Sequence, residues 1–249
     1  MDKSFRNNFL NLCKKYFNDA ELPITFYYTD EAGRAEKVKP GSVARCVIGA
    51  LEKVREGKSL CFDVDAVGCP GGKKYLGFTD SLMPDFNYFL SCGIPGKLEG
   101  ERYKKTPEMV REFMEKHMPA MKAAGKYIVF KRWDKLDEAD SPEVVVFFAE
   151  ADVLSGLFTL ASFDEAGQNM VIAPFGSGCA SIVQYPYVEK DSDTPRGVIG
   201  MFDVSARPFV PQDTLTFSAP MDKFSRMVDN MEESFLITPS WKAVQNRID

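Results

Sequence analysis

The order of the apolar runs along the chain limits its fold more than any other feature. Short runs with the composition of β-strands are mixed irregularly with longer segments whose apolar residues recur at helical spacing. This order predicts a mixed α+β architecture rather than a regular βαβ succession. We expect a single α+β domain over residues 1–249, with an antiparallel-rich sheet in the C-terminal half packed against amphipathic helices. A domain of this length buries enough surface to fold without disulfides or metal.

The strand-like and helical segments can be placed by their periodicity and their flanking residues. The expected strands are 23–28, 60–64, 127–130, 144–148, 170–173, 198–202 and 214–217. The expected helices are 5–17, 43–54, 107–124, 152–161, 179–184 and 220–231, with an amphipathic tail at 235–248. Between them, residues 68–105 are rich in Gly and Pro and are predicted to be a long irregular stretch, which in a compact domain is often functional.

The net charge and the apolar runs argue against a nucleic-acid-binding, secreted or membrane-spanning protein. The net charge is −5, so no nucleic-acid partner is expected. Residues 1–8 lack the pattern of a signal peptide, and the longest apolar run, 144–149, is too short to span a bilayer. We therefore expect a cytoplasmic protein with no membrane contact, whose six cysteines are reduced thiols. The acidic charge and Met-rich helices are compatible with a homodimer.

The lone histidine, His117, restricts the available chemistry. Zinc enzymes with two or three histidine ligands are excluded, and a Ser-His-Asp or Cys-His mechanism would have to use this one residue. His117 falls on the apolar side of the 107–124 segment, so we expect it to be a buried, hydrogen-bonded core residue. Neither a phosphate-binding glycine loop nor a nucleophile-elbow motif is present.

Two cysteines stand beside glycines. Cys69 opens Cys-Pro-Gly-Gly-Lys-Lys, and Cys179 follows Gly178 in the segment 175–181. Glycine allows backbone N–H groups to converge on an anion, and a helix starting at Cys179 would stabilise its thiolate. Both features suit a thiolate that binds metal or attacks an electrophile, although tight turns with buried thiols would give the same pattern. Cys13 and Cys61 are expected in the core, and no pair has Cys-x-x-Cys spacing.

Several segments together resemble an uncharacterised prokaryotic family known as ArCR, one of the domain families of unknown function. The carrying residues are Arg45-Cys46, Gly57-Lys58, Cys69-Pro70-Gly71-Gly72, Leu76-Gly77-Phe78, Gly178-Cys179-Ala180, and Leu215–Pro220 ahead of the 224–231 segment. The resemblance runs from about Pro23 to Glu233, and Cys-Pro-Gly-Gly is its most specific piece. It implies little about activity, but it singles out Cys46, Cys69 and Cys179.

Three hypotheses follow for these residues. The first is that Cys46, Cys69 and Cys179 hold an iron–sulfur cluster or another thiolate-bound metal, with backbone amides of Gly71, Gly72 and Gly178 donating to sulfur and the fourth position taken by solvent, substrate or Cys92. The second is a metal-free module that binds a small molecule, such as an anion. The third, least favoured, is an enzyme with Cys179 as nucleophile. Whether the protein is an enzyme stays open on the sequence.

Overall fold

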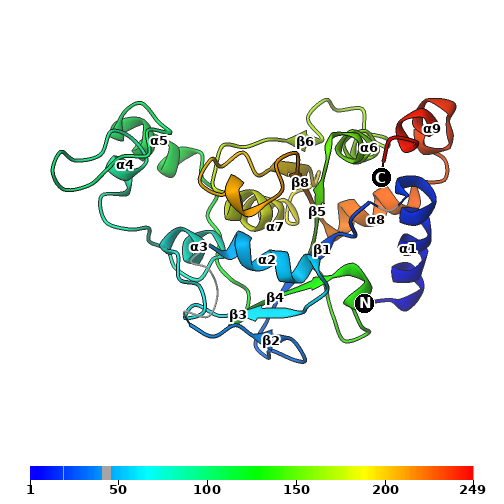
Figure 1. Cartoon of the computed structure of the whole chain (residues 1–249), viewed down its shortest axis with the longest axis horizontal. Helices are drawn as coiled ribbons and strands as arrows, with labels where there is room; N and C mark the ends of the chain where they lie inside the picture. The colour runs from blue at the N-terminus through cyan, green and yellow to red at the C-terminus, as the bar shows by residue number, and fades with distance from the viewer. Residues whose placement is uncertain (19, 41–45, 249) are drawn as a thin grey trace.

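A mixed β-sheet with helices on both faces forms the body of the protein (Figure 1). The computed structural model describes residues 1–18, 20–40 and 46–248. The described strands form one eight-stranded sheet in the order β2-β3-β4-β1-β5-β8-β7-β6. Their bounds are β1 Ile24–Thr29, β2 Glu36–Lys37, β3 Leu60–Phe62, β4 Tyr127–Arg132, β5 Val144–Ala149, β6 Val171–Ile172, β7 Gly197–Gly200 and β8 Leu215–Pro220.

The pairing is antiparallel through the centre of the sheet and parallel only at its edges. β1 pairs antiparallel with both β4 and β5, and β8 pairs antiparallel with β5 and β7. The short edge strands β2 and β6 run parallel to β3 and β7. The predicted α+β class with an antiparallel-rich sheet is therefore confirmed, and the sheet also takes in strands from the N-terminal half.

The helices divide between the two faces of the sheet. On one face lie α2 (Val47–Arg55), α3 (Pro70–Tyr75) and the π-helical η2 (Ala180–Gln184) with its continuation α7 (Tyr185–Glu189); on the other lie α1 (Lys3–Phe17), α6 (Ala151–Ala161), α8 (Met221–Asp229) and α9 (Pro239–Gln245) (Figure 1). Short 3₁₀ turns complete the body: η1 Trp133–Lys135, η3 Arg207–Phe209 and η4 Phe235–Ile237.

Strand β5 shows why both faces must be covered. All six of its residues are buried. Val144, Val146 and Phe148 pack into the core on the α2 side, whereas Val145 and Phe147 pack into the core on the α1 side. Side chains of a strand alternate between faces, so a continuous apolar run needs an apolar layer on each side.

One long excursion leaves this body between α3 and β4. It carries α4 (Phe86–Phe89) and α5 (Pro107–Lys116), and it projects to the left in Figure 1. Its base is closed where the Ala123 amide donates to the Gly77 carbonyl at 2.9 Å. Gly77 has a φ of +76°, and a Cβ there would lie 2.5 Å from the Ala123 nitrogen, so this closure requires glycine.

Several predicted boundaries were wrong within and around this excursion. Residues 68–105 are not all irregular, since α3 begins at Pro70, where a helix tolerates the missing proline N–H. The predicted helix 107–124 ends at Lys116. His117 is its C-cap and is exposed, because α5 lies on the excursion rather than in the core. The predicted start of the 43–54 helix, like Arg45, lies outside the described residues.

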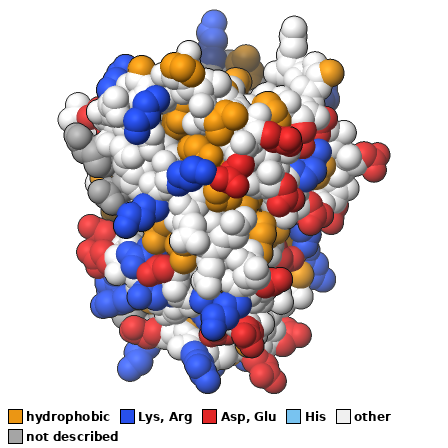
Figure 2. Space-filling view, turned by 90° about the vertical axis from the view of Figure 1, so that its right-hand side faces the viewer, with side chains coloured by type: hydrophobic (Ala, Val, Ile, Leu, Met, Phe, Trp, Pro, Cys, Tyr) orange, Lys and Arg blue, Asp and Glu red, His pale blue; other side chains and the backbone are white. Residues whose placement is uncertain are grey.

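The side of the molecule formed by α1, α8 and α9 carries charges of both signs around a broken strip of apolar side chains (Figure 2). Exposed apolar residues of the neighbouring α6 and η4 include Phe158 and Ile237. None of the helices in the described part of the chain has both the length and the apolar character needed to cross a membrane.

Replacing Phe224 with Ala should destabilise the fold by about 3–5 kcal/mol, because it leaves a cavity among aromatic rings. The Phe224 ring is 1% exposed and lies 5.0 Å from the ring of Phe9 and 5.3 Å from that of Trp133, centroid to centroid. Urea unfolding measures the change. The matched control is Phe158→Ala on the exposed side of α6, with an expected change within about 0.5 kcal/mol. Equal losses in both variants would contradict this packing.

Candidate site of three cysteine thiols

Three cysteines stand where three helices begin on the same face of the sheet. Cys46 is the N-cap residue of α2, and Cys69 is that of α3. Cys179 lies at the start of a continuous helical segment, 178–189, that contains η2 and α7. The remaining cysteines lie elsewhere. Cys13 is in the core on the other face, Cys61 is in the small cluster between β3 and β4, and Cys92 is exposed on the excursion.

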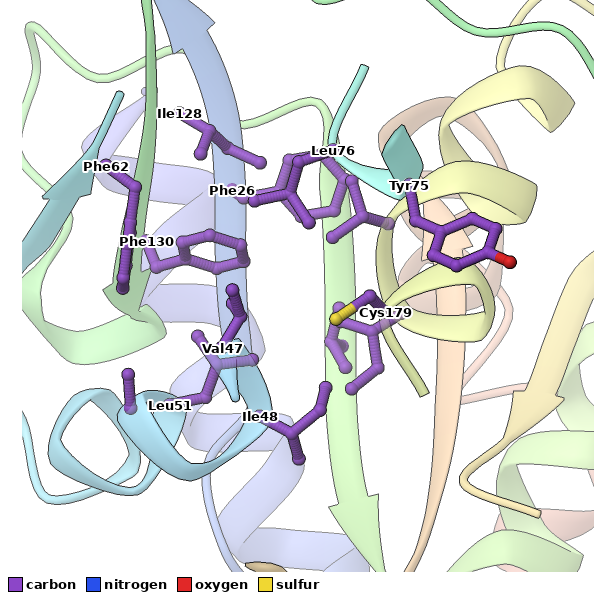
Figure 3. Packing of buried hydrophobic residues seen from close by; sticks show 14 of the residues in the cluster. Phe26, Val47, Ile48, Leu51, Phe62, Tyr75, Leu76, Ile128, Phe130 and Cys179 are labelled. Atoms are coloured by element: carbon purple, nitrogen blue, oxygen red, sulfur yellow. The ribbon is translucent and has the colours of Figure 1, made fainter. Parts of the chain in front are cut away.

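Cys179 belongs to the apolar core beneath α2 and α3. Figure 3 shows its sulfur among the side chains of Val47, Ile48 and Leu76, with Tyr75 beside it. Cys179 is 8% exposed, and Cys46, which is only partly buried, packs against the same cluster. Two of the three thiols therefore contact one apolar cluster, at its edge and within it.

The three thiols are close enough for their charges to interact. Burial raises the pKa of Cys179 well above its usual value, and the neighbouring Cys46 and Cys69 sulfurs raise it further. The Asp203 carboxylate adds to the rise, and the backbone amide of Cys179 acts in the opposite direction. Because burial raises its pKa well above the usual value, this thiol is a neutral S–H group at neutral pH in the absence of a metal.

The pKa of the Cys46 thiol is also raised, and by the same kinds of neighbours. Burial raises the pKa of its thiol, and Cys69 and Asp203 raise it further. The backbone amides of Ile48 and Gly49, in the first turn of α2, act in the opposite direction. Those N–H groups have no partner within the helix, so they are available to a thiolate or to a sulfide bound beside it.

The two glycines next to these cysteines allow the helix starts to approach one another. A Cβ on Gly72 would lie 2.9 Å from Cγ1 of Val67 and 3.5 Å from Cγ2 of Val47 at the start of α2. A Cβ on Gly178 would lie 3.1 Å from the Met201 sulfur and 3.3 Å from Cγ1 of Ile48. A side chain at position 72 would therefore displace Val67, whereas one at position 178 would require Ile48 of α2 or Met201 to shift by a few tenths of an ångström.

The third glycine, Gly71, lies against the Cys69 sulfur. A Cβ there would come 3.7 Å from that sulfur and 3.4 Å from the Tyr75 ring. The predicted glycine loop around Lys73 and Lys74 is a helix, and the Lys74 ammonium donates to the Asp80 carbonyl at 2.9 Å. The predicted loop nest for an anion is therefore replaced by the first turn of α3.

The start of segment 178–189 is held by two side chains. The Ser177 hydroxyl accepts from the Ala180 amide at 3.1 Å, and the Asp203 carboxylate accepts from the Gly178 amide at 3.0 Å. Directly after Cys179 the helix widens into a π-turn, in which the Tyr185 amide donates to the Ala180 carbonyl. Such turns are rare and are often found at functional sites.

Asp203 and Tyr75 are site residues that sequence reasoning missed. Burial raises the pKa of Tyr75 above its usual value, followed by the effects of Cys179, Tyr185 and Asp203. The only sequence signal for Asp203 was Asp-x-Ser after a strand, which is typical of a turn closed by the aspartate side chain. Tyr75 had no signal, because α3 was predicted to be a loop.

The metal-binding capacity of the site depends on how far apart the ligands stand. Within residues 1–18, 20–40 and 46–248, no group of three or more His, Cys, Asp or Glu side chains could hold a metal ion. Ligands of one zinc ion all lie about 2.0–2.3 Å from the same point. The thiols of Cys46, Cys69 and Cys179, all of which are described, do not form such a group.

One family model matches most of the chain, including the three cysteines of this face. The model of a family described as "Uncharacterised ArCR" matches residues 14–230. The chain belongs to the ArCR family. The resemblance expected from the Cys-Pro-Gly-Gly segment is thereby confirmed, and Cys46, Cys69 and Cys179 all lie inside the matched region. Neither the curated proteins nor the solved structures contain a match to the chain.

Alkylation should rank the thiols of the metal-free protein by exposure. At pH 8 iodoacetamide is expected to label exposed Cys92 first and Cys13 much later, because burial raises the pKa of Cys13 to about 12 and leaves about one thiolate in 10⁴ at that pH. Cys61, with a pKa of about 11, and Cys179 should also react slowly. Peptide mass spectrometry over a time course measures the order. Rapid labelling of Cys179 would instead indicate an activated nucleophile.

Proposed function

We propose that this ArCR protein binds an iron–sulfur cluster through Cys46, Cys69 and Cys179. The single observation that carries the proposal is that three thiols from three separate helix starts neighbour one another on one face of the sheet. Burial of Cys179, and after it the neighbouring Cys46 and Cys69 sulfurs, raise the pKa of this thiol, so its deprotonation is unfavourable without a compensating charge. Iron supplies that charge, because a metal ion replaces the thiol proton.

The helix starts add a second kind of support. The first N–H groups of a helix have no intrahelical acceptor, and hydrogen bonds to sulfur are one of the means by which a protein sets the potential of a cluster. At Cys46 these donors are the amides of Ile48 and Gly49. At Cys69, the expected donors are the amides of Gly71 and Gly72 in the first turn of α3. The Gly178 amide is already bonded to Asp203 and drops out of the predicted set.

A cluster is preferred to the other two hypotheses on specific grounds. A nucleophilic cysteine needs a lowered pKa and a base, whereas the pKa of Cys179 is raised and the only histidine, His117, is exposed on the excursion. A metal-free anion site at Lys73 and Lys74 loses its loop and one of its two ammonium groups to the Asp80 carbonyl.

Protein expressed and purified without oxygen should contain iron and acid-labile sulfide in equal amounts, with a broad visible absorption. Each of Cys46→Ala, Cys69→Ala and Cys179→Ala is expected to lose most of both, since a three-thiolate cluster has no spare ligand. Cys92→Ala, on the exposed excursion, is the matched control and should keep the full content.

Two outcomes of these iron and sulfide measurements would contradict the proposal. Equal metal content in the wild type and all three variants would rule these cysteines out as ligands. A wild-type protein that is folded but colourless and free of iron would contradict the proposal and favour the metal-free module that binds a small molecule.

A further inference from the structure

A cavity of about 760 Å³ lies on the face of the sheet opposite the three thiols. Tyr27 of β1 and Lys131 of β4 line it. Their neighbours along the strands, Phe26 and Phe130, pack into the core on the α2 side. Side chains of a strand alternate between faces, so Tyr27 and Lys131 face the α1 side. The volume falls within the range of small-molecule sites, about 300–1,000 Å³.

Segments that are far apart in the sequence enclose this cavity. They are the start of α1, with Lys3 and Arg6, the turn after β1, with Arg34, and residues 137–140 before β5. The start of α1 is joined to the last of these segments, because Nη1 of Arg6 donates to the Leu136 carbonyl. The cavity is therefore bounded by the folded body of the protein and not by one loop.

A buried ionic network forms one wall of the cavity. Lys131 is 5% exposed and Asp140 is 2% exposed, and the ammonium donates to the carboxylate at 2.7 Å. The Tyr27 hydroxyl and the Asp137 amide donate to the same carboxylate, at 2.5 and 2.7 Å. The Asp137 carboxylate accepts from Lys131 at 3.4 Å. A buried network with its hydrogen bonds made holds its side chains in fixed positions, so this wall is ordered without a ligand.

Arg6 is a half-buried cation of this cavity whose charge is not compensated. Among residues 1–18, 20–40 and 46–248, no carboxylate forms an ion pair with its guanidinium. Its Nε is buried and has no acceptor in that part of the chain. A guanidinium carries five N–H donors, and the Leu136 carbonyl is bound by its Nη1. A cation that is partly withdrawn from water without a counter-ion is unfavourable, so an anion at this place would be stabilised.

The acidic residues of the cavity leave this positive charge in place. Asp137 and Asp140 are already bound by the buried lysine. Glu31 and Glu138 are exposed, where water and salt screen their charge. A second guanidinium, that of Arg34, is exposed at the cavity and forms no ion pair or hydrogen bond within the described residues.

We propose that this cavity binds an anionic small molecule whose carboxylate or phosphate group pairs with Arg6, with Arg34 contributing from the exposed side. A planar guanidinium presents parallel N–H donors, which match two oxygens of either group. The three thiols lie on the other face of the sheet, so this inference goes beyond the proposed function and does not rest on it.

Isothermal titration calorimetry of the full chain tests the site with two probes, inorganic phosphate and succinate, at constant ionic strength. The wild type should bind at least one of them at one site per chain. Arg6→Gln should weaken this binding about tenfold or more, because it removes a charge-assisted pair from a partly buried place. Arg34→Gln should weaken it about two- to fivefold, since Arg34 is exposed. Lys14→Gln, at an exposed position of α1 outside the cavity, is the matched control and should bind as the wild type does.

The two probes separate the possible ligand groups. Binding of phosphate alone would support a phosphate group, and binding of succinate alone would support a carboxylate. Binding of neither probe would overturn the proposal, as would equal affinities in the wild type, Arg6→Gln and Arg34→Gln. Circular dichroism reports whether Arg6→Gln folds, and if it does not, an unchanged affinity in Arg34→Gln overturns the proposal by itself. Cys69→Ala should bind the probes as the wild type does, so this site and the proposed cluster can fail independently.

Discussion

The burial of the central strands on both faces is the constraint from which the rest of the structure follows. β5 has no residue that faces water, so the sheet cannot leave either side open. Each apolar layer needs helices with an apolar stripe, and the chain supplies α1, α6, α8 and α9 on one side and α2 and α7 on the other. The thiol site exists because the second layer brings helix starts, rather than helix middles, to one place.

Helix starts suit sulfur chemistry for an electrostatic reason. Their unpaired N–H groups and the positive end of the helix dipole favour negative charge nearby. Burial acts in the opposite sense, since it disfavours an isolated thiolate. At Cys179 burial has the larger effect, whereas at Cys46 the first-turn amides offset part of it. The two thiols therefore differ in character, and Cys69 at the start of α3 is partly buried, as Cys46 is.

Periodicity predicted most of the fold but little of the geometry of the site. Segments such as 144–148 and 220–231 were predictable because one face or both faces are apolar at a fixed spacing. α3 was missed because Pro and Gly dominate its six residues, and these usually mark loops. His117 was predicted to be buried because spacing shows which face of a helix is apolar but not whether anything covers it. Asp203 was missed since no local pattern reports which distant backbone amide a carboxylate meets.

The π-turn after Cys179 controls the direction of the sulfur independently of the sheet. An α-helix advances about 100° per residue, so one extra residue in a turn rotates everything before it by roughly that angle relative to everything after it. Cys179 lies before the turn and Tyr187, which packs on the central strands, lies after it. Removing a single residue from 180–184 would therefore swing the thiol away from α2 and α3 while Tyr187 kept its place. The direction of the Cys179 side chain therefore depends on the number of residues in this turn, and the deletion of one residue would change it.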